Sequence, residues 1–236
     1  MKNKLIGGVV GGAALLWSST AVWAGTVIEL RDAEGVEQRI LVEQELGRFE
    51  SDDGRRYVLL DVSEKRFLLV DNEQRAVFDM SVMLQEAPPE SVNGPADEPT
   101  VEAVEQGPGP EIAGFATQHF VLQADGQPCQ EVYVSRELLE QAGLVPFLAA
   151  FGDLARYTRE LEGEGAPDTH PCERMEPSVE LMALGMPLRT VGPGGELEEE
   201  VVEVRADVAL PEDAFALPQD YQVIVFGSPD PGAPAP

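Results

Sequence analysis

Positive charge is scarce in this chain. It has 16 lysines and arginines against 43 aspartates and glutamates, which gives a formal net charge of −27 at pH 7. Because phosphate groups are bound through lysine and arginine, we expect nucleic acids and anionic lipid surfaces to be repelled. The sequence also lacks a glycine period, a heptad run and a second long apolar span, which excludes collagen-like, coiled-coil and polytopic membrane proteins. Hydrophobic residues still make up 43% of the chain, enough to build a packed core.

Residues that usually carry catalysis or bind metal are also few. The chain has two histidines and two cysteines, and it contains neither a Gly-x-Ser-x-Gly elbow nor an Asp-x-Asp-x-Asp-Gly calcium loop. His119 lies in a predicted strand and is interpreted as a structural residue. A metal cluster of Asp168, His170, Cys172 and Glu173 is the weaker alternative, since zinc needs about four convergent ligands. The sequence therefore predicts a protein that is not an enzyme and that has no catalytic residues, no metal and no cofactor.

The N-terminus has the pattern of a secretory signal peptide. Lys2 and Lys4 precede an uncharged, largely apolar stretch, and Val22 and Ala24 place small residues before a cleavage point. We expect residues 1–24 to be removed, which leaves no transmembrane span and a periplasmic or secreted protein. An uncleaved anchor is the alternative, but the glycines of this stretch would make a poor spanning helix.

Short apolar runs of strand length follow the signal peptide. They are separated by clusters of turn-forming residues and recur about every ten residues, which predicts an antiparallel meander. The predicted strands are residues 26–30, 39–42, 57–62, 67–70 and 76–80.

Residues 85–111 differ in composition from the runs on either side. The segment holds six prolines, three glycines and seven acidic residues without a basic partner. Such a composition predicts an extended, solvated loop, which is either a linker between two domains or an insertion in one.

The second half of the chain combines strands with two helices. Residues 117–123, 131–135, 179–182, 188–191 and 222–226 predict strands, and residues 202–208 alternate between apolar and charged side chains. Residues 136–143 and 144–161 predict helices, with Ser135 as the N-cap and Gly143 as the C-cap. Residues 227–236 are expected to be a disordered tail.

Cys129 and Cys172 are the only cysteines, and in an exported chain they most simply pair. The resulting disulfide would close a loop around both predicted helices. By the chain-entropy model, such a loop stabilises the fold by roughly 4 kcal/mol.

Four short motifs, taken in their order and spacing, carry a resemblance to a known family. They are residues 112–115 (IAGF), 129–135 (CQEVYVS), 185–188 (GMPL) and 215–221 (FALPQDY). With the meander they resemble an uncharacterised secreted bacterial domain family related to the lipoprotein-carrier fold. The resemblance covers residues 27–226, across the acidic loop, so it favours a single domain over 25–226 with an insertion at 85–111. It implies a mainly β (α+β) fold: a curved antiparallel sheet, or half-barrel, with a short helical lid on its concave face.

The same resemblance implies a function. Lipoprotein carriers accept acyl chains between sheet and helices, so the apolar face of the second helix, together with two methionines and a leucine farther along the chain, would line a cavity for a lipid or acyl chain. The predicted lining residues are Leu144, Phe147, Leu148, Phe151, Leu154, Met182, Leu184 and Met186. In the alternative hypothesis the core is filled, and either the acidic loop or an exposed sheet edge binds an envelope protein.

Overall fold

The computed structural model describes residues 24–51, 53–86, 99–162, 172 and 183–226. Its first half holds the strands β1 (Ala24–Asp32), β2 (Glu37–Glu43), β3 (Leu46–Ser51), β4 (Arg56–Asp61), β5 (Arg66–Asp71) and β6 (Ala76–Asp79), followed by the short helix α1 (Val82–Gln85). The second half holds β7 (Val101–Pro108), β8 (Gln118–Ala124), β9 (Gln127–Ser135), α2 (Arg136–Gln141), α3 (Val145–Glu162), β10 (Met186–Val191), β11 (Leu197–Ala209) and β12 (Gln222–Val225).

All twelve of these strands belong to one sheet. Their order is β12-β6-β5-β4-β3-β2-β1-β11-β10-β9-β8-β7. The first six strands follow one another as an antiparallel meander, which confirms the sequence prediction for this half. The two halves meet where β1 pairs with β11 along its whole length.

The sequence reading missed β3. Its apolar residues do not alternate cleanly, and Gly47 interrupts the run. The glycine is required by packing, because a Cβ atom at this position would lie 2.7 Å from the Phe147 ring of α3. The residue that weakens the strand pattern is therefore the one that lets α3 approach the sheet.

The alternation predicted for residues 202–208 holds except at its first position. Val204, Ala206 and Val208 are partly buried, whereas Val202 is 38% exposed. The pairing of β1 with β11 shifts register here, because Glu29 pairs with Glu203 and Leu30 with Val201. Val202 is thus the extra residue of a bulge, and bulges of this kind bend a sheet.

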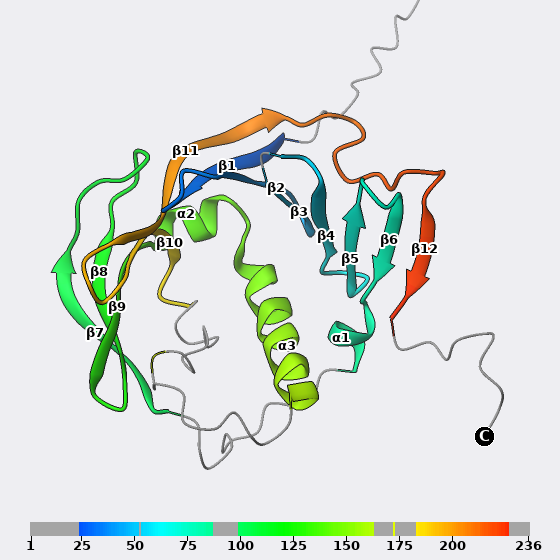
Figure 1. Cartoon of the computed structure of the whole chain (residues 1–236). Coiled ribbons are helices and arrows are strands. Elements are labelled where there is room, and N and C mark those ends of the chain that lie inside the picture. The colour runs from blue at the N-terminus through cyan, green and yellow to red at the C-terminus, as the bar shows by residue number, and fades with distance from the viewer. Residues whose placement is uncertain (1–23, 52, 87–98, 163–171, 173–182, 227–236) are drawn as a thin grey trace, which may run out of the picture.

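The sheet curves around the helices. Figure 1 shows α2 and α3 inside the curve, with α1 near the ends of β5 and β6. Both predicted helices are confirmed, although α2 ends at Gln141 and not at residue 143. The Ser135 hydroxyl accepts a hydrogen bond from the Leu138 amide at 3.3 Å, and Gly143 has a left-handed φ of 67°. The fold is mainly β, with an open, curved sheet, as predicted. No helix in the described ranges is both long enough and apolar enough to cross a bilayer.

The predicted loop over residues 85–111 needs correction. Residues 101–108 form β7, which pairs with β8 and covers an edge that would otherwise be free. Ala103 packs on the cluster around Leu122, while Glu102 and Glu105 face solvent. Charged side chains are common on edge strands, where they discourage pairing with another chain. Residues 87–98 of the predicted loop lie outside the described residues, as do the predicted signal peptide up to residue 23, the predicted strand 179–182 and the tail.

Candidate functional site

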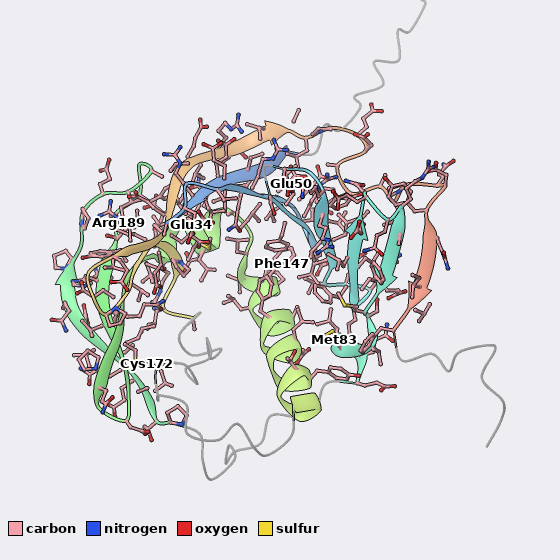
Figure 2. All side chains as sticks on the ribbon, viewed as in Figure 1. Glu34, Glu50, Met83, Phe147, Cys172 and Arg189 are labelled. Atoms are coloured by element: carbon pink, nitrogen blue, oxygen red, sulfur yellow. A yellow bond between two sulfur atoms is a disulfide. The ribbon has the colours of Figure 1, made fainter. Side chains whose placement is uncertain are left out.

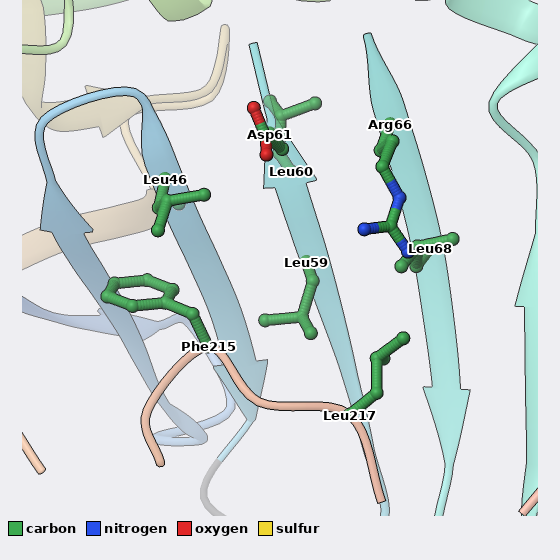
Figure 3. Close-up of a pocket in the computed structure, with 9 residues that line it drawn as sticks. Leu46, Leu59, Leu60, Asp61, Arg66, Leu68, Phe215 and Leu217 are labelled. Atoms are coloured by element: carbon green, nitrogen blue, oxygen red, sulfur yellow. The ribbon is translucent and has the colours of Figure 1, made fainter. Parts of the chain in front are cut away.

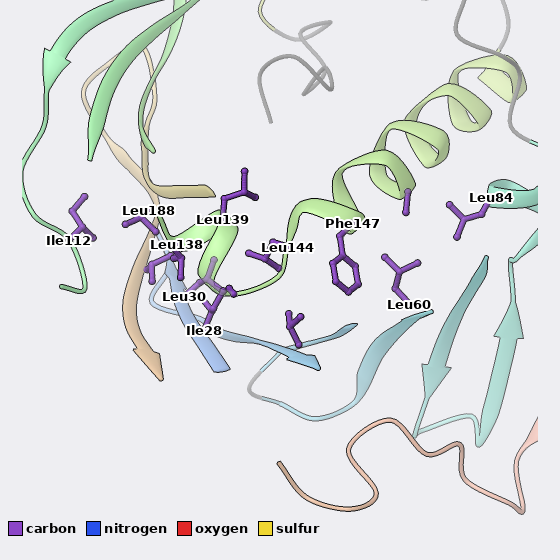
Figure 4. Packing of buried hydrophobic residues seen from close by; sticks show 14 residues of the cluster. Ile28, Leu30, Leu60, Leu84, Ile112, Leu138, Leu139, Leu144, Phe147 and Leu188 are labelled. Atoms are coloured by element: carbon purple, nitrogen blue, oxygen red, sulfur yellow. The ribbon is translucent and has the colours of Figure 1, made fainter. Parts of the chain in front are cut away.

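The space between α3 and the sheet is occupied by side chains. The largest cluster of buried residues is centred on Phe147, which is fully buried and projects from α3 toward the strand that carries Leu60 (Figure 4). Figure 2 shows the same ring inside the curve of the sheet. Phe151 adds an edge-to-face contact with Phe49, with ring centroids 5.6 Å apart. The helix therefore packs directly onto β3 and β4.

Most of the predicted ligand-lining residues contribute to this packing. Leu144 and Phe147 are buried within the cluster, and its partly buried margin includes four more of them: Leu148, Phe151, Leu154 and Met186. Leu184 joins a separate cluster with Leu122, Val132 and Val134. Met182 lies outside the described residues. The structure thus brings six of the eight together, as parts of a core.

Neither of two cavities that lie among the described residues is bordered by a predicted lining residue. One, of about 100 Å³, lies on the outer face of the sheet, where Phe215 and Leu217 cover β3 to β5 (Figure 3). The other, of about 300 Å³, has a mixed polar and apolar lining from β7 to β9 and from the turn at Gly192. Sites for drug-sized apolar ligands usually enclose about 300–1,000 Å³ with mainly apolar walls. The first cavity is too small for such a ligand, and the second is only at the lower limit and is partly polar. Binding of a hydrophobic ligand remains a prediction.

Residues 210–221, which we call the strap, pack on the outer face of the first half of the sheet. The Arg48 guanidinium lies 3.8 Å above the centre of the Tyr57 ring and donates hydrogen bonds to Glu50 at 2.6 Å and to the Ala214 carbonyl at 2.9 Å. Burial raises the pKa of the Tyr57 phenol, and the nearby Arg48 charge opposes this shift. Further along, the Tyr221 hydroxyl donates to Asn72 Oδ1 at 3.0 Å. These contacts thus hold the FALPQDY motif, residues 215–221, on the sheet directly before β12 begins.

The last strand occupies one edge of the sheet. β12 pairs with β6 in parallel, which departs from the antiparallel pattern of all the other pairs. No described strand pairs with its other side. Val223, Ile224, Val225 and Phe226 are all apolar, and each is between 40% and 58% exposed. A run of large apolar residues on an open edge is unusual, since natural proteins usually protect such edges with charge, proline or a covering element.

An apolar row leads across the inner face of the sheet to this edge. The register places four residues directly opposite one another: Val58 of β4, Leu69 of β5, Phe78 of β6 and Ile224 of β12. The first three are only partly buried, and they belong to none of the four buried clusters. We call this row the edge strip. Three of its four residues lie on β5, β6 and β12, beyond the strands β3 and β4 that α3 packs against.

A buried carboxylate stands beside the edge strip. Asp71 accepts hydrogen bonds from the Gln74 backbone amide at 2.8 Å and from Arg56 Nε at 2.8 Å. These contacts, the Gln74 amide first, lower the pKa of the Asp71 carboxyl, although burial opposes them. Its contacts hold the turn between β5 and β6 and tie the end of β5 to Arg56 of β4, so Asp71 has a structural role.

The structure also places both cysteines and His119. Cys129 and Cys172 form a disulfide with a Cα–Cα distance of 5.2 Å, which confirms their pairing and ties residue 172 to β9. His119 stacks on Tyr133, with ring centroids 4.4 Å apart, and its Nε2 lies 3.0 Å from Glu131 Oε2. Within the described ranges, no group of three His, Cys, Asp or Glu residues could hold a metal ion. The other members of the alternative metal cluster lie outside those ranges.

These features define a mainly β protein with an open, curved sheet, a packed core between sheet and helices, and an apolar strand at one free edge. No family model matches the sequence, and comparison with curated proteins gives no significant match. The predicted half-barrel agrees with this architecture, while the relation to the lipoprotein-carrier family itself remains a prediction.

Among solved structures, the chain is similar to the crystal structure of MucB. The sequence identity is 14% and the TM-score 0.37, and the match covers 85% of this chain and 58% of the other. The complex of MucB with MucA(peri) gives 12% identity, a TM-score of 0.36, and coverage of 86% and 57%. The MucA/MucB complex of Pseudomonas aeruginosa gives 12% identity, a TM-score of 0.36, and coverage of 85% of this chain and 57% of the other. The chain thus spans less than two thirds of the matched chains, and a likeness this weak carries no conclusion about activity or partner.

Proposed function

We propose that this protein is a non-enzymatic interaction module of the cell envelope, which binds a partner protein by strand addition at β12. The proposal rests on one observation: four consecutive apolar residues, Val223 to Phe226, are exposed on an edge that no described strand pairs with. An extended peptide that adds to such an edge gains main-chain hydrogen bonds and buries the apolar side chains.

The contrast between the two edges of the sheet supports this choice. β7, at the opposite edge, carries Glu102 and Glu105, which discourage pairing with another strand. β12 carries no charged residue. Only one of the two edges is therefore chemically suited to accept a further strand.

The packed core supports an interaction module over a carrier of lipids. Phe147, Leu144 and their neighbours fill the space that an acyl chain would occupy in a carrier. The site on β12 also agrees with the sequence-based alternative, in which an exposed sheet edge binds an envelope protein. Export to the envelope is itself part of the proposal and depends on the signal-like pattern of residues 1–24.

Site-specific photo-crosslinking in the native host tests the proposal. A photoreactive phenylalanine analogue replaces Ile224, and in a matched control it replaces Val36, an apolar residue that is 46% exposed in the turn between β1 and β2. We expect protein adducts from position 224 only, with the cross-linked peptide mapping to one segment of one envelope protein. Equal adducts from both positions, or adducts with lipid alone, would contradict the proposal.

A further inference from the structure

We propose that the partner segment of β12 is an extended strand with apolar side chains on its inner face and a lysine or arginine on its outer face, and that Asp79 of β6 pairs with this cation. The inference rests on the proposed function, since it specifies the chemistry of the partner at the same edge. It follows from three observations at this edge: the direction of the main-chain groups of β12, the apolar composition of the inner face, and the charge that Asp79 of the neighbouring β6 places on the outer face.

The main-chain groups that would accept a new strand belong to Val223 and Val225. The amides of Gln222 and Phe226 donate to the carbonyls of Arg75 and Asp79 at 3.0 and 2.8 Å, so they point toward β6. Successive residues of a strand point their main-chain groups to alternate sides. The amides and carbonyls of the two valines therefore face the open edge, ready to pair with a peptide.

The inner face beside β12 favours a partner strand with apolar side chains. Ile224 lies opposite Phe78, which continues the edge strip through Leu69 to Val58. A further strand beside β12 would extend this row by one position and cover the exposed part of Ile224. Alternate residues of the partner, which point to this face, would therefore be apolar.

The outer face beside β12 favours a partner strand with a positive charge. Asp79 lies opposite both Val225 of β12 and Leu68 of β5, and Leu68 packs under the strap, which places Asp79 on the outer face. Its carboxylate accepts hydrogen bonds from the Ser81 amide and hydroxyl. The described structure gives it no cationic partner.

The neighbouring carboxylates are already neutralised. Asp71 is paired with Arg56, and Asp220 with Arg75. Asp79 is therefore a carboxylate near β12 whose negative charge is not paired with a described cation. A partner residue beside Val225 would be about two strand spacings, or about 10 Å, from Asp79, a distance that a lysine or arginine side chain can bridge. The net charge of −27 favours a cationic partner in general.

Synthetic peptides test this inference on the full chain. One labelled probe has the sequence Lys-Val-Lys-Val-Lys-Val-Lys, and its matched control replaces every lysine by glutamate. Two pairs of variants complete the design. Asp79→Asn is compared with Glu34→Gln, which removes the same charge at a distant turn, and Val225→Pro with Val225→Thr, which keeps the amide. Circular dichroism and thermal unfolding establish that each variant is folded.

We expect fluorescence anisotropy to show binding of the lysine probe and none of the glutamate probe. Asp79→Asn should weaken binding of the lysine probe about twofold to fivefold, the range of a partly exposed ion pair, whereas Glu34→Gln should leave it unchanged. Val225→Pro should weaken it about tenfold through the lost amide and the bulk of the ring, and Val225→Thr should have little effect.

Other results separate this inference from the proposed function. If both probes bind equally and both are lost in Val225→Pro, the edge accepts a strand but the inferred charge is wrong. If the lysine probe binds regardless of Val225→Pro, binding is a general charge effect and the inference is wrong. If neither probe binds while cross-linking from position 224 still identifies a partner, only the inference falls. A dimer that becomes a monomer in Val225→Pro would make a second copy the occupant and would also overturn it.

Discussion

The ring of Phe147 lies directly against the backbone of Gly47. A Cβ atom added to the glycine would be 2.7 Å from Cε1 of the ring, closer than van der Waals contact allows. This approach lets α3 sit on β3 and fill the inner side of the sheet. Helix and strand are thus fitted to each other, although about 100 residues separate them in sequence.

Gly47→Ala is expected to destabilise the protein by about 1–3 kcal/mol, because the new methyl group overpacks the contact with Phe147. In the background of Phe147→Leu, which makes room for the methyl group, the same substitution should cost less. Chemical denaturation of the two single variants and the double variant measures this coupling. Equal costs in both backgrounds would show that Gly47 and Phe147 do not constrain each other.

Asp71 is expected to make stability depend on pH in the acid range. Because the folded protein lowers the pKa of this carboxyl below its ordinary value of 3.8, the stabilising contribution is present above pH 3.8. It is lost as the pH falls through the lower pKa of the folded state. The difference in unfolding free energy between the unmodified protein and Asp71→Asn should therefore shrink below pH 3.8. Glu34→Gln, at an exposed turn, is the control, and a difference that stays constant with pH would contradict the assignment.

The disulfide is expected to contribute about 4 kcal/mol, the value of the chain-entropy model for cysteines 43 residues apart. The double variant Cys129→Ser/Cys172→Ser should lose stability by this order, as measured by denaturant unfolding. Reduction of the unmodified protein should have a similar effect, and reduction of the double variant should have none. Two titratable thiols in the denatured, unreduced protein would show that the bond does not form.

The packed core predicts that the purified protein carries no acyl chain. Organic-solvent extraction followed by mass spectrometry should find no stoichiometric lipid, and a fluorescent fatty acid should not bind. Phe147→Ala is a useful comparison, because it removes a fully buried ring and opens an apolar cavity that a small ligand could enter. A stoichiometric lipid in the unmodified protein would favour the carrier hypothesis instead.

Local signals in the sequence were sufficient for most of the secondary structure. Periodicity, turn residues and capping chemistry act over a few residues, and they predict the meander, both helices and the Ser135 cap. The pairing of the cysteines follows from their number in an exported chain. β3 and β7 were missed because their reasons are distant in sequence: Gly47 is set by Phe147, and the acidic residues 101–108 form a strand only because β8 offers them a free edge.

The candidate site illustrates the same division. Local patterns and composition were enough to predict a strand over residues 222–226, an apolar face on the helix over residues 144–161, and a strongly acidic chain. Three other properties follow from the folded arrangement alone: the strand lies in parallel at an edge, the helix face is buried in the core, and Asp79 has no cationic partner among the described residues. Pattern and composition are local properties, whereas exposure and pairing depend on which distant segments the folded chain brings together.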